Sequence, residues 1–355
     1  MPDLGDLRSR IDRIDRELIR LLAERAEVVA AIGERKRVEG ESALDPARER
    51  ELFERLAGEE RGQFPLAGLQ AIFREVVSAS RAIQGDFRIG YLGQPGGFAH
   101  QAATRRFGKS SSYEPLAAAQ QLLERIESER LEYGVFALEG DPEDPAFDAF
   151  DLFLTAEARI VAEFVDRAGY QALGHAAAPK RLYAHPAALS LCQRWRASLP
   201  SGTEIEPVAG SGEAGRRAAL DPEALCIAPP IVAETVHLPV FDAAAEDAPR
   251  RPRRFLVLGA GESKPSGRDK TALLLSLENR PGRLLEVLRC LASHDVNVGW
   301  IESRTHRWRP GEHLFLLELS GHRLEEPLRA ALDEIRPATL LHRILGSFPA
   351  ADPVP

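Results

Sequence analysis

The sequence contains few sulfur-bearing residues. Its 355 residues include one methionine and three cysteines, Cys192, Cys226 and Cys290, which are far apart. Three scattered cysteines cannot form the disulfide framework of a small secreted domain, and they lack the paired spacing of a structural zinc site. We identify no metal-ligand spacing among the nine histidines either. The sequence therefore predicts no metal and no cofactor, and a location in the reducing cytoplasm.

The sequence also lacks long apolar runs and an excess of positive charge. No stretch approaches the roughly 18 apolar residues of a membrane span, and the first residues, MPDLGDLRSR, contain no hydrophobic signal region. The net charge is −8, and no basic run of the nucleic-acid-binding type is present. The length and the apolar content of 44% predict a globular protein of two or three domains. Binding to membranes or nucleic acids is not expected.

The first 40 residues contain an apolar stripe that is interrupted by a charge. Apolar residues recur at steps of three and four on one face of a single long helix: Leu7, Ile11, Ile14, Leu18, Leu21, Val28 and Ile32. Arg25 stands in this row, and Lys36 lies on an adjoining one. A buried charge is costly unless it is paired, so these cations face an anion, or Arg25 extends from the edge of the stripe to solvent.

Two further predicted helices also carry polar groups on their inner faces. The second follows an Asp-Pro pair, whose residue types suit an N-cap and a first helical position. The third covers about 66–84. The inward polar groups of the three helices are Arg25, Lys36, Arg48, Glu49, Ser80 and Gln84. Cations, a carboxylate, a hydroxyl and an amide together suit a small polyanion that carries a hydroxyl group.

The expected first domain, residues 1–86, resembles the all-helical chorismate mutase family. The runs that carry the resemblance are LRSRIDRIDRELIRLLAERAEVVAAIGERK, LDPARERELFERL and SASRAIQ. The positions that form the family's site all carry its residue types: Arg8, Arg25, Lys36, Asp45, Arg48, Glu49, Ser80 and Gln84. At about 1.5 Å per residue the first helix is roughly 50 Å long, too long for one small domain to cover. The resemblance implies a homodimer in which Arg8 reaches the partner's site.

The resemblance implies the isomerisation of chorismate to prephenate, which needs no general base. Catalysis would come from holding the reactive shape and from stabilising negative charge on the breaking ether oxygen. Arg8, Arg25 and Arg48 would bind the two carboxylates of chorismate in bidentate pairs. Lys36 and Gln84 would donate to the ether oxygen. Glu49 and the Asp45 region would receive the ring hydroxyl, and Ser80 would contact a carboxylate.

From Arg88 the sequence changes to short apolar strands that alternate with helical stretches. Strands are predicted at 88–93, 133–138, 160–164, 181–183, 225–228 and 255–258. Such alternation is typical of an α/β fold. Residues 87–262 resemble the two-lobed prephenate dehydratase family, which acts on the product of the mutase in phenylalanine biosynthesis.

The residues expected to perform dehydration differ from that family's pattern. The family's GPEGTFSHQAA, IENS, HPQ and NxTRF correspond to GQPGGFAHQAA, LEGD, HPA and RPRRF. The altered or retained positions of this degenerate site are Gly97, Glu139, Gly140, Ala187, Arg253, Arg254 and Phe255. An arginine, with a pKa above about 12, cannot replace the threonine as proton donor near neutral pH. The domain is expected to be inactive. Alternatively, it binds a prephenate-like anion through His100, Asp141, Arg253 and Arg254, or acts as a decarboxylase without dehydration.

The last segment, residues 268–348, resembles the ACT regulatory domain, an α+β fold of the ferredoxin-like type. The pattern predicts strand, helix, strand and strand, with a Pro-Gly turn into the helix. The family's phenylalanine motifs GALV and ESRP appear as GRLL and ESRT. The resemblance assigns an effector site to Gly282, Leu284, Glu302, Ser303 and Arg304. The tail after about residue 347, which includes 349–355, is expected to be disordered.

Three functions follow from these resemblances. The first is a regulated chorismate mutase of aromatic amino acid biosynthesis, with an inactive dehydratase-like domain and phenylalanine as a possible effector. The second is a bifunctional mutase and dehydratase that forms phenylpyruvate. The third is a non-enzymatic sensor of aromatic amino acids, in which the helices only dimerise. The complete set of mutase positions argues against the third, and the lost threonine, asparagine and glutamine argue against the second.

Overall fold

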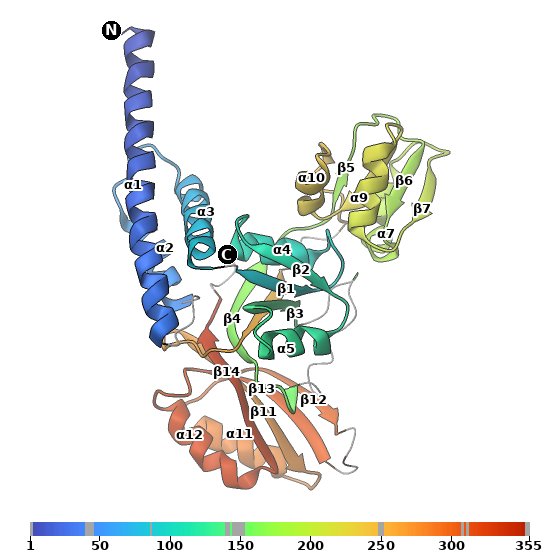
Figure 1. Cartoon of the computed structure of the whole chain (residues 1–355). Coiled ribbons are helices and arrows are strands. Elements are labelled where there is room, and N and C mark those ends of the chain that lie inside the picture. The colour runs from blue at the N-terminus through green and yellow to red at the C-terminus, as the bar shows by residue number, and fades with distance from the viewer. Residues whose placement is uncertain are drawn as a thin grey trace.

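The computed structural model of the chain describes residues 3–39, 46–85, 87–138, 143, 153–247, 252–306, 309 and 312–351. They form an all-helical segment, a two-lobed α/β segment and an α+β segment, in chain order (Figure 1). This organisation confirms the predicted fold classes. None of the helices in the described ranges is long and apolar enough to cross a membrane.

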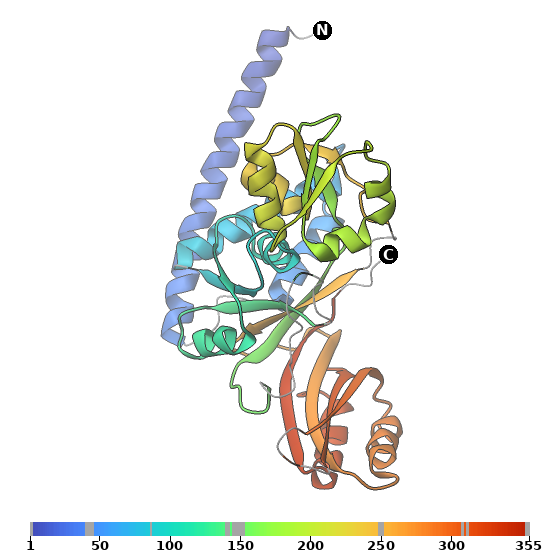
Figure 2. The same ribbon diagram turned by 90° about the vertical axis from the view of Figure 1, so that its right-hand side faces the viewer.

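The first segment consists of three helices: α1 (Leu4–Glu39), α2 (Pro46–Gly58) and α3 (Leu66–Gln84). α3 packs against the C-terminal half of α1, and the N-terminal half projects away from the rest of the chain (Figures 1 and 2). The apolar stripe on α1, predicted to face a core, is exposed along its whole length, from Leu7 to Ile32. The N-terminal half has no helix beside it, and in the C-terminal half α3 packs on the row that includes Val29 and Gly33 instead.

The first lobe of the α/β segment is a five-stranded sheet with helices on both faces (Figure 1). Its elements are β1 (Arg88–Leu92), α4 (Phe98–Phe107), β2 (Ser112–Leu116), α5 (Ala119–Glu127), β3 (Tyr133–Ala137), β4 (Arg159–Asp166) and β10 (Arg253–Gly259). The strand order is β2-β1-β3-β10-β4. β1, β2 and β3 run parallel, whereas β10 is antiparallel to both of its neighbours.

The second lobe is inserted between β4 and β10. Its elements are β5 (Gln171–Leu173), β6 (Arg181–Ala184), α7 (Pro186–Leu191), α8 (Gln193–Ala197), β7 (Glu204–Pro207), α9 (Ser211–Leu220), β8 (Ala224–Ala228), α10 (Pro230–Val236) and β9 (Val240–Asp242). The strand order is β7-β6-β8-β5-β9. Phe98 and Phe255 of the first lobe share one buried cluster with Leu182 of the second. The six strands predicted from the sequence are all present, within two residues of their expected ends.

The C-terminal domain is a four-stranded antiparallel sheet with two helices on one face (Figure 1). Its elements are β11 (Asp269–Glu278), α11 (Arg283–Ser293), β12 (Val298–Thr305), β13 (Glu312–Ser320), α12 (Leu328–Ile335), the 3-10 turn η1 (Arg336–Ala338) and β14 (Leu341–Pro349). The strand order β12-β13-β11-β14 is that of a ferredoxin-like fold. Leu291 and Leu332 of the helices pack on one face of the sheet. Leu274 on the other face packs against Leu256 of the first lobe.

The expected disorder after about residue 347 is wrong for the first part of the tail. β14 pairs with β11 as far as Pro349, and Phe348 is fully buried. The Ala351 N–H then donates to the Glu163 carboxylate at 2.7 Å. Burial of one aromatic side chain and pairing to β11 fix this stretch, although the sequence there is rich in proline and alanine. Residues 352–355 lie outside the described ranges.

Candidate functional site

A groove of about 620 Å³ lies between α1 and α3. Its walls are mostly apolar and include Leu22, Ile72 and Val76, while its polar residues are Arg25, Glu75 and Ser80. Cavities of about 300–1,000 Å³ with apolar walls and a few polar groups are typical of small-molecule sites. The helices that resemble a mutase therefore carry a ligand-sized groove at the level of Arg25.

Arg25 and Ser80 meet in this groove. The Arg25 guanidinium donates to Ser80 Oγ, which in turn donates to the Val76 carbonyl at 2.6 Å. Burial lowers the pKa of Arg25, but an arginine remains positively charged at neutral pH. Among the residues that the structure describes, no carboxylate lies within ion-pair distance of Arg25. Glu75 lines the same groove, but the direct partner of this half-buried cation is a hydroxyl, which favours an anionic ligand.

Gln84 at the end of α3 approaches the part of α1 that carries Lys36. Gln84 packs against Gly33, where an added Cβ would come within 2.7 Å of Gln84 Cγ. The absence of a side chain at Gly33 therefore allows the end of α3 to approach α1. Lys36 is half-buried and follows Gly33 by three residues, or about 4.5 Å along the helix axis. The two predicted donors to the ether oxygen thus come from the same end of the α1–α3 pair.

Glu49 does not line the groove. Its carboxylate pairs with Arg81, and with Arg106 of α4 at 2.5 Å. Burial alone would raise the pKa of Glu49, but Arg106 and Arg81 hold it below its usual range, so the carboxylate stays ionised. The Arg81 guanidinium also lies over the rings of Phe107 and Phe87, at 5.5 and 5.8 Å from their centroids. Glu49 is therefore placed at the junction of the helical segment with the first lobe, where two guanidinium groups compensate its buried charge.

The other predicted mutase residues are spread along the helices. Arg48 is exposed and pairs with Glu51 at 2.6 Å. Arg8 is exposed on the projecting part of α1, 17 residues before Arg25, which is about 25 Å along the axis. Asp45 lies outside the described residues. A single chain therefore brings Arg25 to Ser80 in the groove. The other described residues of the predicted site do not line it: Arg8, Lys36, Arg48, Glu49 and Gln84.

In the α/β segment, Arg253 lies on the aromatic surface between the two lobes. Its guanidinium carbon is 3.6 Å from the centroid of the Phe98 ring. Nη1 donates to the Ala168 carbonyl at 2.6 Å, and Nη2 is 3.8 Å from the Glu246 carboxylate. Only 12% of the side chain is exposed. The position where the resemblance expects a proton-donating threonine therefore holds a cation whose donors already bind the protein.

The two lobes approach each other at the N-terminus of α9. A Cβ on Gly96, which has a φ of +86°, would lie 2.7 Å from Gly212 Cα. The Ser211 N–H and hydroxyl donate to the Glu143 carboxylate at 3.1 and 2.6 Å, and the Tyr170 hydroxyl donates to it at 2.7 Å. A helix N-terminus favours bound anions, and here a carboxylate of the chain itself occupies that position.

The remaining predicted dehydratase positions are placed as follows. Gly97 is the N-cap of α4, and Ala187, in the first turn of α7, donates its N–H to His185 Nδ1 at 3.3 Å. His100 stacks on Tyr91 with 4.7 Å between ring centroids. Burial lowers the pKa of His100, which keeps its ring neutral at pH 7 and makes it a poor partner for an anion. Glu139, Gly140 and Asp141 lie outside the described residues.

Arg254 and Phe255, which we included in the predicted site, make contacts that belong to the packing of the chain. Side chains alternate along a strand, so Arg254 points to the opposite face of β10 from Arg253. It pairs with Glu163 at 2.6 Å and with Glu318 of β13, while Lys270 is 2.8 Å from Glu163. Phe255 is fully buried and stacks on Phe164 with 5.6 Å between centroids. We therefore reassign both residues, Arg254 to the contact with the C-terminal domain and Phe255 to the core.

The predicted effector residues lie on two elements of the C-terminal domain. Gly282 is the N-cap of α11 with a φ of +86°, and Leu284 is half-buried in the first turn of that helix. Glu302, Ser303 and Arg304 lie on β12, the strand at one edge of the sheet. Arg304 and Glu302 form an exposed ion pair at 3.3 Å.

Sequence reasoning missed several polar residues that organise these regions. Arg81 directly follows Ser80, but a single arginine on an exposed-looking helix gives no sign that it binds Glu49 across a domain junction. Glu143 lies in an acidic stretch without a motif. The four-residue spacing of Cys290 and His294 near the end of a predicted helix indicates that their side chains lie close together.

Comparisons with known proteins agree with this division of the chain. Residues 7–85 match the family model of chorismate mutase type II, and residues 89–263 match that of prephenate dehydratase. The bifunctional chorismate mutase/prephenate dehydratase of Aquifex aeolicus is 34% identical over 359 residues, covering 99% of each chain. The protein of the same name from Neisseria gonorrhoeae is 30% identical over 351 residues, covering 97% of this chain and 96% of that one.

A solved structure supports the fold of the second and third segments. Prephenate dehydratase from Arthrobacter aurescens in complex with L-Phe superimposes with a TM-score of 0.67 and 24% identity, covering 76% of this chain and 91% of that chain. The similarity to the two named proteins extends over the helical segment as well. The chain belongs to the family of bifunctional chorismate mutase/prephenate dehydratases.

Proposed function

We propose that this protein isomerises chorismate to prephenate in the groove between α1 and α3, as a homodimer. The observation that carries the proposal is the pairing of Arg25 with Ser80 in a groove whose walls are mostly apolar. Arg25 binds one carboxylate of the substrate, and Ser80 orients both groups. Lys36 and Gln84, near the C-terminal ends of α1 and α3, donate to the ether oxygen as its bond to the ring breaks. No proton changes place in this reaction, so no acid or base is required.

The exposed stripe on α1 supports the dimer. Ile11, Ile14 and Leu18 are each more than half exposed in the single chain, which is unfavourable for large apolar side chains in water. Pairing of two α1 helices would bury the stripe. Arg8 lies about 25 Å along the axis from Arg25 of its own chain, too far to contribute to the same site. Arg8 therefore completes the site of the other chain. Glu49, kept ionised by two arginines, accepts the ring hydroxyl only if the arrangement of α2 changes on binding.

We further propose that the second domain does not complete the dehydration of prephenate. Dehydration requires a proton for the leaving hydroxyl while carbon dioxide departs. Arg253 stacks on Phe98 and donates to Ala168, and it cannot give up a proton near neutral pH. Glu143 occupies the N-terminus of α9, where a substrate carboxylate would otherwise gain most. Both observations support a domain whose polar groups are satisfied by the chain itself.

A bifunctional enzyme that forms phenylpyruvate is the second candidate. It is favoured by the two relatives that carry both activities in their names and align over nearly the whole chain. In that case another group must supply the proton, and Glu143, within hydrogen-bonding distance of Ser211 and Tyr170, is the carboxyl to test first.

We propose phenylalanine as the effector of the C-terminal domain. The support is the resemblance of its two motifs and the similar fold of a prephenate dehydratase solved with L-Phe. Binding of phenylalanine to the full chain, measured by calorimetry, is expected to weaken in the variant Ser303→Trp, which places a large side chain on β12. Unchanged binding in that variant would place the effector elsewhere.

One assay separates the candidate functions. Purified full-length protein is supplied with chorismate at mildly alkaline pH, and prephenate and phenylpyruvate are followed separately. Prephenate is expected to accumulate, and phenylpyruvate is expected to form no faster than in prephenate without enzyme. Phenylpyruvate formed at the rate of the mutase step, and lost in Glu143→Gln, would establish the bifunctional enzyme instead. Absence of prephenate would leave the non-enzymatic sensor.

A further inference from the structure

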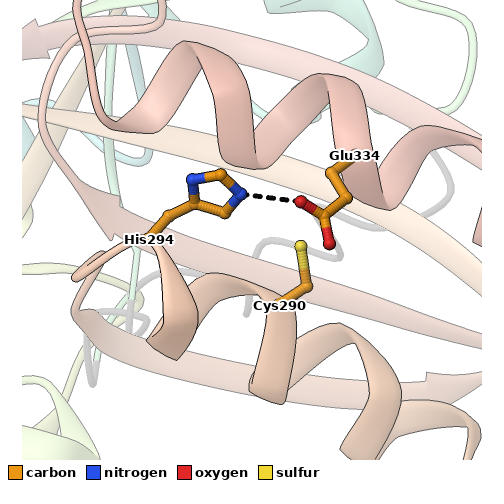
Figure 3. Close-up of side chains that lie close together, drawn as sticks. All are labelled: Cys290, His294 and Glu334. Carbon is orange, nitrogen blue, oxygen red and sulfur yellow. Dashed lines mark hydrogen bonds and ion pairs between the residues drawn. The ribbon is translucent and has the colours of Figure 1, made fainter.

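Three potential metal ligands meet between the two helices of the C-terminal domain. Cys290 lies on α11 and His294, four residues later, is the C-cap of that helix, so both side chains lie at its C-terminal end. Glu334 on α12 points toward both of them (Figure 3). His294 Nε2 is 2.8 Å from a Glu334 carboxylate oxygen. The ligand atoms of the three side chains all lie within 4.8 Å of one another.

The surroundings of this cluster suit the entry and retention of a cation. Cys290 and His294 are half-buried, and Glu334 is exposed, so the cluster is open to solvent on one side and supported by the helices on the other. The Cys290 thiol contacts the Glu334 carboxylate, and its sulfur lies 4.0 Å from the Ala331 carbonyl, which is a weak contact. Contacts at a surface contribute little to stability, and the three side chains present three different ligand types at one place.

We propose that Cys290, His294 and Glu334 bind Zn²⁺ or a chemically similar transition-metal ion. A sulfur, an imidazole nitrogen and a carboxylate oxygen match the ligand preference of zinc, whereas Mg²⁺ and Ca²⁺ prefer oxygen ligands. With bonds of about 2.0–2.3 Å, a tetrahedral ion needs its ligand atoms about 3.3–3.8 Å apart. Small rotamer changes from the observed separations reach this spacing. The thiol proton leaves to solvent, and thiolate and carboxylate together neutralise the two charges of the ion.

The fourth position of the ion would be taken by water. Glu326 lies near enough to interact electrostatically with His294, but its carboxylate already binds Arg329 at 2.7 Å and the Ala330 N–H at 3.2 Å. Three protein ligands and an open position are the arrangement of an accessible rather than a closed zinc site. Because two ligands come from α11 and its C-cap and one from α12, the ion connects these helices. The N-cap of α11 is Gly282, where we propose the effector.

Titration of the full-length, metal-free protein with Co²⁺ tests this proposal. Co²⁺ bound by a thiolate gives an intense near-ultraviolet charge-transfer band, and tetrahedral coordination gives strong visible bands. We expect saturation at one Co²⁺ per chain and loss of the bands when Zn²⁺ is added. Zn²⁺ should also raise the thermal unfolding midpoint, since a ligand that binds only the folded state stabilises it.

Variants at the cluster decide whether these residues are the ligands. Cys290→Ser should abolish the charge-transfer band. His294→Gln and Glu334→Gln should each weaken Co²⁺ binding more than about tenfold, because loss of even a residue that only orients a metal ligand weakens metal binding about 10- to 100-fold. His313→Gln, on β13 of the same domain, is the matched control and should bind Co²⁺ as the natural sequence does. A band that persists in Cys290→Ser, or no band in the natural sequence at millimolar Co²⁺, would overturn the proposal.

Discussion

The α1–α3 groove and the junction of the two lobes both hold an arginine against apolar or aromatic surface, but the charges are compensated differently. Arg25 bonds to a serine hydroxyl and has no carboxylate partner among the described residues. Arg253 stacks on a ring, donates to a carbonyl and lies near Glu246. A ligand can improve the surroundings of the first cation, while it must displace existing contacts of the second. This difference, rather than residue type, separates the proposed active site from the proposed silent one.

Two other arginine clusters show that a fully compensated cation serves structure. Arg81 and Arg106 enclose Glu49 where the helices meet the first lobe. Arg254 joins Glu163 to Glu318 where the first lobe meets the C-terminal domain. Both clusters are largely buried and connect segments distant in sequence. The distinction between compensated and uncompensated cations therefore makes opposite predictions for catalysis and for stability.

Loss of Lys36 should have the largest effect on catalysis. Lys36→Ala should lower kcat for prephenate formation about 100- to 1,000-fold, because a donor aimed at developing charge contributes about 3–4 kcal/mol to the transition state. Steady-state kinetics with chorismate measures the change. Arg20→Ala, on the same helix but exposed and paired with Glu17 and Glu24, is the control and should remain within a few-fold of the unaltered protein. Equal activity of Lys36→Ala and the control would remove the groove as the mutase site.

Loss of Arg254 should affect stability rather than mutase turnover. Arg254→Ala leaves Glu163 and Glu318 buried with Lys270 and, for Glu163, the Ala351 N–H beside them, and breaking a buried pair costs about 3–5 kcal/mol. We expect a decrease toward the lower end of that range in the free energy of unfolding, measured by denaturant titration. Arg125→Ala breaks a more exposed pair with Glu114 and should cost less than about 1 kcal/mol. An Arg254 variant as stable as the Arg125 variant would contradict the assignment of Arg254 to the domain contact.

Sharing of the mutase site between chains predicts a partial rescue. Arg8→Ala and Arg25→Ala should each be nearly inactive alone. After subunit exchange, half of the dimers carry one of each chain and hold one intact site, so about a quarter of full activity should return. Prephenate formation before and after exchange, with exchange confirmed by mass, is the measurement. No recovery after confirmed exchange would show that Arg8 acts within its own chain or not at all.

The sequence predicted elements with strong periodicity and missed those fixed by tertiary contacts. The central strands of the lobes were expected because they are short apolar runs between turns. The edge strand Ser112–Leu116, which contains a proline, and the three-residue strands β5 and β9 carry no such signal. They form because neighbouring strands offer hydrogen bonds.

The sites divide along the same line. A row of residues on a helix face indicated Arg25 and Ser80, and the structure brings them together. The direction of Glu49 depends on Arg106, which is 57 residues away in the chain. That of Arg254 depends on Glu318, 64 residues away. Helical or strand spacing within one segment contains no information about such partners.

Restoring the missing hydroxyl at position 253 should have the smallest effect on catalysis. Arg253→Thr is expected to form phenylpyruvate no faster than the unaltered protein, although it supplies the residue type that the resemblance expects. Ala187 still lacks the amide that would hold the substrate, and Glu143 still occupies the N-terminus of α9. The rate is measured with prephenate at mildly alkaline pH and corrected for spontaneous breakdown, and Arg217→Thr on the exposed surface of α9 is the control. A clear rise in the rate of phenylpyruvate formation in Arg253→Thr alone would mean that the arginine blocks an otherwise intact site. The contrast between the α1–α3 groove and the junction of the lobes would then depend on one side chain.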